Sequence, residues 1–242
     1  MTPSVKLTID GRFITASRGQ TILEAAEAAG IWIPRLCHRQ QLEPYGGCRV
    51  CTVRVNGRPA PACAQPVAPD LVVENETEEV IGWRRAIIEM LFVEGNHFCM
   101  MCEASGACEL QALAYRLGVT GPRYPFLWPR RSVDASHPDV MIDRNRCILC
   151  ARCERASRDV DGKTVFGFTG RGPDKRLAVN APGPLAETDL DAADSAVDAC
   201  PVGAILRKGA AYQTPIGQRR YDRDPIGSKL KPTPGRPPEQ LP

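Results

Sequence analysis

Cysteine is the residue type in this sequence with the clearest potential for chemistry, because thiolates are strong ligands for soft metals. Eight of the eleven cysteines fall in three short runs, and the other three stand alone in the sequence. The runs are Cys48 and Cys51; Cys99, Cys102 and Cys108; and Cys147, Cys150 and Cys153; the isolated cysteines are Cys37, Cys63 and Cys200. An odd count and an N-terminus without a secretory signal argue against a disulfide framework. The pattern favours metal binding.

The first set combines a C-x2-C run with two distant cysteines, in the order Cys37, Cys48, Cys51 and Cys63. Four thiolates can hold a [2Fe–2S] cluster, and plant-type ferredoxins use a similar order with a shorter first loop. Gly46 and Gly47 precede Cys48, so backbone amides there could approach the sulfurs closely. A zinc site is the alternative, but zinc ligands usually come as two short knuckles. We therefore expect an iron–sulfur cluster.

The third set is more specific. Cys147, Cys150 and Cys153 form C-x2-C-x2-C, and the distant Cys200 is followed by Pro201, which is half of the bacterial ferredoxin arrangement. The local fourth position is occupied by Ser157, and no second triple run precedes Cys200. The set predicts one [4Fe–4S] cluster bound by the triple run and Cys200.

The second set leaves three cysteines, Cys99, Cys102 and Cys108, for a cluster that needs four ligands. His97 is the nearest group that could supply the fourth, and imidazole ligation is known from Rieske centres. A zinc site with three cysteines and one histidine would use the same four ligands and remains an alternative. His38 is expected near a cluster or at the surface, and His137 lies in a connecting segment.

Three segments of secondary structure are expected to position these residues, in an α+β arrangement. In residues 1–78, alternating residues flank Asp10-Gly11 as in a hairpin, Thr21 and Glu24 have capping-box spacing for a short helix, and strand-like pieces follow in "CRVCTVRVNG" and "DLVVENE". In residues 79–140, a helix preceded by the N-cap Thr77 ends before His97, and "ELQALAYRLGV" predicts another helix. Residues 141–208 contain the third set. Residues 209–242 are rich in proline and charge and are expected to be a tail, disordered alone or laid across a partner.

Composition excludes several functions. The net charge of +3 comes from 31 basic and 28 acidic residues that are well mixed, which offers no stripe for nucleic acid and no polybasic membrane anchor. The longest apolar stretch, near "AIIEMLFV", is too short to span a bilayer, so we expect a soluble cytoplasmic protein. No catalytic constellation is present, and "GFTGRG" at 167–172 is interpreted as a turn rather than a nucleotide site.

The motifs "CRVC", "CEASGACELQ" and "RCILCARC…CPVGAI", in this order, resemble the N-terminal part of the large iron–sulfur subunit of respiratory complex I. The same module occurs in iron-only hydrogenases, NAD-dependent formate dehydrogenases and the diaphorase iron–sulfur subunit of soluble NAD-reducing [NiFe] hydrogenases. The resemblance covers about residues 4–208. It implies a β-grasp [2Fe–2S] ferredoxin-like domain, a small helical domain with a His/Cys3 [4Fe–4S] cluster, and a bacterial-ferredoxin-like [4Fe–4S] domain. In the complex I pattern the histidine stands four positions before its first cysteine, whereas His97 stands two before Cys99.

Within this family, the short "NHFC" form and the chain length resemble the diaphorase subunit. The resemblance implies a non-catalytic relay of electrons between a [NiFe]-hydrogenase module, with its small and large subunits, and a diaphorase subunit that binds FMN and NAD. The alternatives are a relay subunit of a formate dehydrogenase, an iron-only hydrogenase or a complex I-like NADH dehydrogenase. A zinc-stabilised binding protein is a rival of another class.

Overall fold

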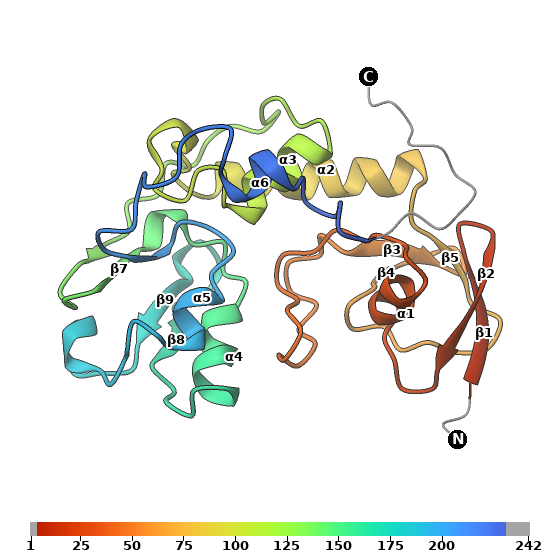
Figure 1. The fold of residues 1–242 in the computed structure, drawn as a ribbon, viewed down its shortest axis with the longest axis horizontal. Helices are drawn as coiled ribbons and strands as arrows, with labels where there is room; N and C mark the ends of the chain where they lie inside the picture. The colour runs from red at the N-terminus through yellow and green to blue at the C-terminus, as the bar shows by residue number, and fades with distance from the viewer. Residues whose placement is uncertain (1–3, 231–242) are drawn as a thin grey trace.

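The structure is a computed structural model that describes residues 4–230, and its elements follow the three segments expected from the sequence. The N-terminal sheet and helix α1 lie at one end of the molecule, the third segment lies at the other, and α2 and α3 extend above both (Figure 1). The strands are β1 Ser4–Ile9, β2 Arg12–Ser17, β3 Thr52–Val55, β4 Arg58–Pro61, β5 Val72–Glu74, β6 Val133–Asp134, β7 Val140–Asp143, β8 Phe166–Thr169, β9 Arg176–Val179 and β10 Ile205–Arg207. The α-helices are α1 Ile22–Ala28, α2 Glu78–Val93, α3 Glu109–Arg116, α4 Arg152–Asp159, α5 Ser195–Asp198 and α6 Arg220–Arg223.

The N-terminal segment is a five-stranded mixed sheet in the order β2-β1-β5-β3-β4. The β1–β2 hairpin turns at Asp10 and Gly11, whose φ angles of 49° and 75° are left-handed, as tight turns of this type require. Helix α1 begins at a complete capping box between Thr21 and Glu24, as the sequence predicts. Its apolar side chains are buried with those of the sheet in one core. This arrangement is the expected ferredoxin-like α+β fold.

Helix α2 joins the N-terminal sheet to the second segment. The Thr77 side chain accepts a hydrogen bond from the Val80 amide at 3.3 Å, so the predicted N-cap is confirmed. Arg84 projects from α2 and is almost completely buried. Its guanidinium donates to the carbonyl oxygens of Thr52 and Asn75 at 3.1 and 2.9 Å, which fixes the helix to strands β3 and β5. Helix α3 occupies the second position predicted to be helical.

The third segment is built on short antiparallel ribbons. Strands β10, β7 and β6 form one sheet, and β8 pairs with β9 in a separate hairpin. The expectation that 167–172 is only a turn is wrong for its first half, because residues 167–169 belong to β8. Phe166 and Leu177 of this hairpin are buried in a second apolar core, which also contains Val140, Ile142 and Ile205, and this burial explains why a glycine-rich stretch is extended here. Helices α4 and α5 contact each other beside this core.

Residues 209–230 lie on this chain's own second segment. The Tyr221 amide donates to the Gly106 carbonyl at 2.8 Å, and the Tyr212 hydroxyl donates to the Met101 carbonyl at 2.7 Å. Short helix α6 lies beside α3 (Figure 1). The expected tail at 209–242 therefore includes a part that packs within the chain, while residues 231–242, like residues 1–3, lie outside the described residues. None of the helices in the part of the chain that the structure describes is long and apolar enough to cross a membrane.

Candidate iron–sulfur centres

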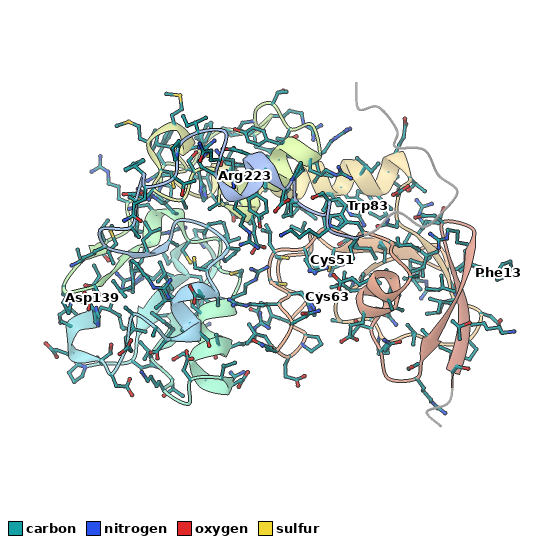
Figure 2. The ribbon with its side chains drawn as sticks, viewed as in Figure 1. Phe13, Cys51, Cys63, Trp83, Asp139 and Arg223 are labelled. Atoms are coloured by element: carbon teal, nitrogen blue, oxygen red, sulfur yellow. The ribbon has the colours of Figure 1, made fainter. Side chains whose placement is uncertain are left out.

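The first cysteine set lies at the open end of the β3–β4 hairpin. Thr52 pairs with Pro61 at this end of the hairpin. Cys51, just before Thr52, and Cys63, two residues after Pro61, therefore lie at the same end of the two strands. Both lie on the side of the N-terminal domain that faces the centre of the molecule (Figure 2). The Cys37 amide donates to the Cys48 sulfur at 3.3 Å, which brings the long first loop back to the C-x2-C run. The structure thus gathers all four cysteines at one place.

The thiols of this first set share hydrogen bonds. Hydrogen bonds from Cys48 and Cys63 lower the pKa of Cys37, and a hydrogen bond from Cys63 lowers the pKa of Cys51. The same bonds raise the pKa of Cys48 and of Cys63, which are the donors. The four thiols are therefore close enough to share protons, and a bound metal centre would take the place of those protons.

The third set is assembled by the β7–β10 pairing. Ile205 lies opposite Ile142 in an antiparallel register. Cys200 precedes Ile205 by five residues and Cys147 follows Ile142 by five, so both extend from the same end of the ribbon. Strand pairing, rather than local spacing, supplies the distant fourth cysteine.

All four cysteines of the third set line one small cavity. Its other lining residues are mostly apolar: Ile148, Ala151, Phe168, Leu177, Val202, Ala204 and Ile205. Leu149 and Ala151 have left-handed φ angles of 53° and 57°, so the C-x2-C-x2-C loop curls around this space. Burial raises the pKa of Cys147 to about 11 and that of Cys150 to about 12. Buried thiols around an apolar cavity suit a metal centre, because each thiol loses its proton when the metal binds.

The second set lies on the segment between α2 and α3. Cys99 is in a short 3-10 helix, Cys102 caps that helix, and Cys108 is the N-cap of α3. Burial raises the pKa of Cys99, and the neighbouring thiol of Cys102 adds to the effect. Burial raises the pKa of Cys108 to about 12, again with contributions from Cys102 and Cys99. The three thiols are therefore close enough to influence one another's charge.

His97 has the properties of a neutral nitrogen ligand. Its Nε2 is buried and has no hydrogen-bond partner. Burial lowers the pKa of His97 to about 4, and the positive charge of Arg146 adds to this shift, so the ring is neutral near pH 7. The ring packs edge-on against Phe92, and a hydrogen bond with the backbone of Leu91 involves Nδ1, because Nε2 has no partner. A ring nitrogen fixed to backbone and a free, buried Nε2 is the usual arrangement of a metal-binding histidine.

Glycine is required where the second and third sets approach each other. A Cβ built on Gly203, in the "CPVGAI" run, would lie 2.8 Å from the Cys102 sulfur and 3.2 Å from the Ala104 Cβ. A Cβ on Gly95 would lie 2.6 Å from His97 Nε2. Both glycines therefore leave room for predicted ligands, and no larger residue fits without displacing them.

Arginines of the third motif connect the three sets, which sequence reasoning missed. Arg146 contacts the Cys102 sulfur at 3.7 Å and forms an ion pair with Glu103. Arg155 donates to the carbonyl oxygen of Cys37 at 2.5 Å. The available signal was the placement of arginines directly before, within and just after the cysteine run of "RCILCARCER".

Other residues singled out from the sequence have structural roles. His137 is buried, contacts the Leu190 carbonyl at 3.0 Å, and accepts backbone hydrogen bonds at its Nδ1. Ser157 accepts a hydrogen bond from the Val165 amide at 2.9 Å. His38 is buried next to Cys37, and its Nδ1 has no partner. Among residues 4–230, no group of three or more histidine, cysteine or acidic side chains is arranged to hold a single metal ion.

Three family models match the chain in succession. A 2Fe-2S iron–sulfur cluster binding domain matches residues 2–78, an NADH-ubiquinone oxidoreductase-G iron–sulfur binding region matches 84–123, and the ferredoxin-like domain of NADH-quinone oxidoreductase subunit 3 matches 137–206. The chain is thus an iron–sulfur protein of the class that forms electron-relay subunits of oxidoreductases, with one [2Fe–2S] and two [4Fe–4S] clusters. The predicted cofactors and fold class are confirmed.

Relatives along the whole chain define the family more narrowly. The NAD-reducing hydrogenase HoxS subunit gamma of Cupriavidus necator is 40% identical over 221 residues, 90% of this chain and 94% of that protein. A solved structure of an NAD+-reducing [NiFe]-hydrogenase in the H2-reduced state contains a chain with a TM-score of 0.90 and 47% identity, covering 93% of this chain and 97% of that one. The chain belongs to the family of these hydrogenase gamma subunits. It is also 34% identical to the mitochondrial NADH-ubiquinone oxidoreductase 78 kDa subunit of Candida albicans, of which it spans 32%.

Proposed function

We propose that this chain is the electron-relay subunit of a soluble NAD-reducing [NiFe] hydrogenase. In this function, hydrogen oxidation at a hydrogenase module is coupled to NAD+ reduction at a flavin-containing diaphorase subunit, and this chain conducts electrons between them. The observation that carries the proposal is similarity along nine-tenths of the chain to a hydrogenase gamma subunit, together with three sets of buried or partly buried cysteines. Bound iron–sulfur clusters would supply the one-electron chemistry.

We assign the ligands as the sequence predicts them. Cys37, Cys48, Cys51 and Cys63 would hold the [2Fe–2S] cluster. His97, Cys99, Cys102 and Cys108 would hold one [4Fe–4S] cluster, and Cys147, Cys150, Cys153 and Cys200 would hold the other. Support comes from the thiol hydrogen bonds of the first set, the free Nε2 of the histidine and the apolar cavity of the last set.

This chain's own residues keep water from the cysteines and supply donors to the sulfurs. Backbone amides next to the ligands, such as that of Leu149 near Cys147, lower the thiol pKa against the larger effect of burial. The same donors would stabilise added negative charge on a reduced cluster, and burial would oppose it. The balance between these two terms would set the potential of each cluster.

An exposed apolar surface beside the second set supports assembly with partner subunits. Met100 is 95% exposed and Met101 is 75% exposed, next to the stacked rings of Phe98 and Trp128. Leu127 extends the same surface. Soluble monomers rarely expose a contiguous apolar patch of this kind, so we expect a partner subunit to cover it.

We further propose the division into domains at 1–78, 79–140 and 141–208, followed by the tail 209–242, of which the described part, residues 209–230, packs on the second domain. Each proposed domain contains one ligand set. We also place the protein in the cytoplasm. None of the eleven cysteines forms a disulfide, which favours a reducing compartment, and cell fractionation tests this placement.

The test of the proposed function is purification of the chain with its partners, followed by iron analysis and assay. We expect about ten irons per chain and EPR signals from one [2Fe–2S] and two [4Fe–4S] clusters after reduction. The complex should reduce NAD+ with hydrogen, and separated modules should retain only their reactions with artificial dyes. A formate-dependent or zinc-containing preparation would contradict the proposal.

A further inference from the structure

One buried ion pair touches all three ligand-bearing loops. Arg152 lies between Cys150 and Cys153 at the start of α4, and only 4% of its surface is exposed. Its guanidinium nitrogens donate to both carboxylate oxygens of Glu109, each at 2.8 Å. Nη2 also donates to the His38 carbonyl at 2.9 Å. Glu109 follows Cys108 and His38 follows Cys37, so a single side chain joins loops 114 and 43 residues away in the sequence.

The geometry of this contact specifies arginine. Two parallel N–H···O bonds to one carboxylate use the planar fork of a guanidinium, and the same group supplies the additional bond to a carbonyl. A lysine ammonium could reach one of these acceptors but could not make the paired contact. Arg155, one turn further along α4, donates to the carbonyls of Cys37 and Glu43 at 2.5 and 2.6 Å and reinforces the link to the first loop.

The pair lies at the wall of a polar cleft. Arg152, Glu109 and His38 line this cleft together with residues of the N-terminal domain, such as Trp32, and of the segment around Tyr221. The cleft is lined by residues of the first and third segments at this point, next to the apolar contacts that also join them. Direct hydrogen bonds from α4 to the His38 and Cys37 carbonyls add a directional link between the two loops.

The charge of Arg152 also acts on the third set. Arg152 stands between the predicted ligands Cys150 and Cys153 in the sequence, so its positive charge lies close to the third set. The carboxylate of Glu109 is paired with the same guanidinium at 2.8 Å and partly offsets this positive charge. Removing either partner would therefore change the electrostatic potential at the third set in opposite directions.

We propose that Arg152 and Glu109 form a positioning pair that holds the three ligand-bearing loops at fixed separation and sets the reduction potential of the third cluster. This inference rests on the proposed relay function. Arg152 binds no substrate and ligates no metal; it acts through the loops it connects. The pair determines how well electrons pass between clusters, while cluster assembly depends on the cysteines.

The test uses the complete complex with the variants Arg152→Lys, Arg152→Met and Glu109→Gln. The matched control is Arg158→Met, because Arg158 lies on the same helix, is half exposed and forms its ion pairs with Glu154 and Asp159 of that helix. Iron content, EPR-monitored redox titration, hydrogen exchange of residues 37–43, and three activities are measured. The activities are hydrogen-dependent NAD+ reduction and the dye reactions of the two partner modules.

We expect Arg152→Lys to keep about ten irons and both dye reactions but to lower hydrogen-dependent NAD+ reduction by about tenfold or more. Amide exchange at 37–43 should rise. Arg152→Met should lower the reduction potential of the third cluster, and Glu109→Gln should raise it, whereas a purely structural role gives no such opposite signs. Arg158→Met should match the wild type in every measurement.

Three outcomes would overturn the inference while leaving the relay function intact. They are wild-type NAD+ reduction by Arg152→Lys, loss of iron from that variant, or potentials that move in the same direction in Arg152→Met and Glu109→Gln. Failure of the wild-type complex to contain the clusters or to reduce NAD+ with hydrogen would instead remove the proposed function itself.

Discussion

Gly203→Ala is the substitution whose effect the structure specifies most closely. Gly203 lies in the third motif, yet the added Cβ would sit 2.8 Å from the sulfur of Cys102 in the second motif. The Ala104 Cβ at 3.2 Å and Arg146 Nη1 at 3.4 Å bound the remaining space. The φ angle of Gly203 is outside the left-handed region, so steric contact alone would oppose the alanine.

The magnitude follows from two opposing terms. Alanine reduces the entropy of the unfolded chain and so contributes about 0.4–1 kcal/mol of stability where its conformation is allowed. Overpacking at a buried contact costs about 1–3 kcal/mol. The net loss is therefore about 1–2 kcal/mol, or about 2–8 °C in Tm for a chain of this size. The contact that must move involves a predicted ligand, so the second cluster should be affected more than the fold.

The assay is iron analysis and EPR of the reduced complex, together with thermal unfolding. We expect Gly203→Ala to lose the second [4Fe–4S] signal in a large fraction of molecules and to approach about six irons per chain. The [2Fe–2S] signal should be unchanged, because the first set has no contact with Gly203 among those that crowd its Cβ position.

The control is Gly82→Ala on helix α2. A Cβ there meets nothing within 4 Å, and alanine is the better helix former by about 1 kcal/mol, so this variant should be as stable or more stable with full iron. Unchanged iron and EPR spectra in Gly203→Ala would refute the steric reasoning. Equal loss from all three clusters would refute the assignment of Cys102 to the second one.

Three further predictions follow from single residues. His97→Ala should lose the second cluster, whereas His97→Cys should retain it at a lower potential, since imidazole ligation raises the potential; redox titration distinguishes the two. Cys200→Ala should lose the third cluster and about four irons, whereas Ser157→Ala should keep its iron and lose about 1 kcal/mol of stability in denaturant titration, through the hydrogen bond to Val165. Thr77→Ala should destabilise α2 by about 1 kcal/mol without changing iron content, because only an N-cap hydrogen bond is removed.

Local sequence patterns were enough to predict the first hairpin, the starts of the first two helices and the types of cluster. Turn residues at Asp10 and Gly11, the capping box at Thr21 and the N-cap at Thr77 act within a few residues of their own position, so the first hairpin and the helices that follow could be predicted. The cysteine spacings likewise define the cluster types, because a cluster imposes its own geometry on the loop that binds it. Strands β8 and β9 could not be anticipated, since their extended form depends on burial against distant residues rather than on a local pattern.

Only the tertiary structure decided how the cysteine sets are completed and connected. Cys200 joins the triple run because β10 pairs with β7, and Cys63 joins Cys51 because β3 pairs with β4. Gly203 approaches Cys102 closely, although the two residues belong to different motifs. Arg152 contacts Glu109 and His38, which are 43 and 114 residues away in the sequence. The spacing of cysteines along a chain predicts which ligands can share a cluster. It does not predict the distance between loops, because that distance depends on how strands and helices pack in three dimensions.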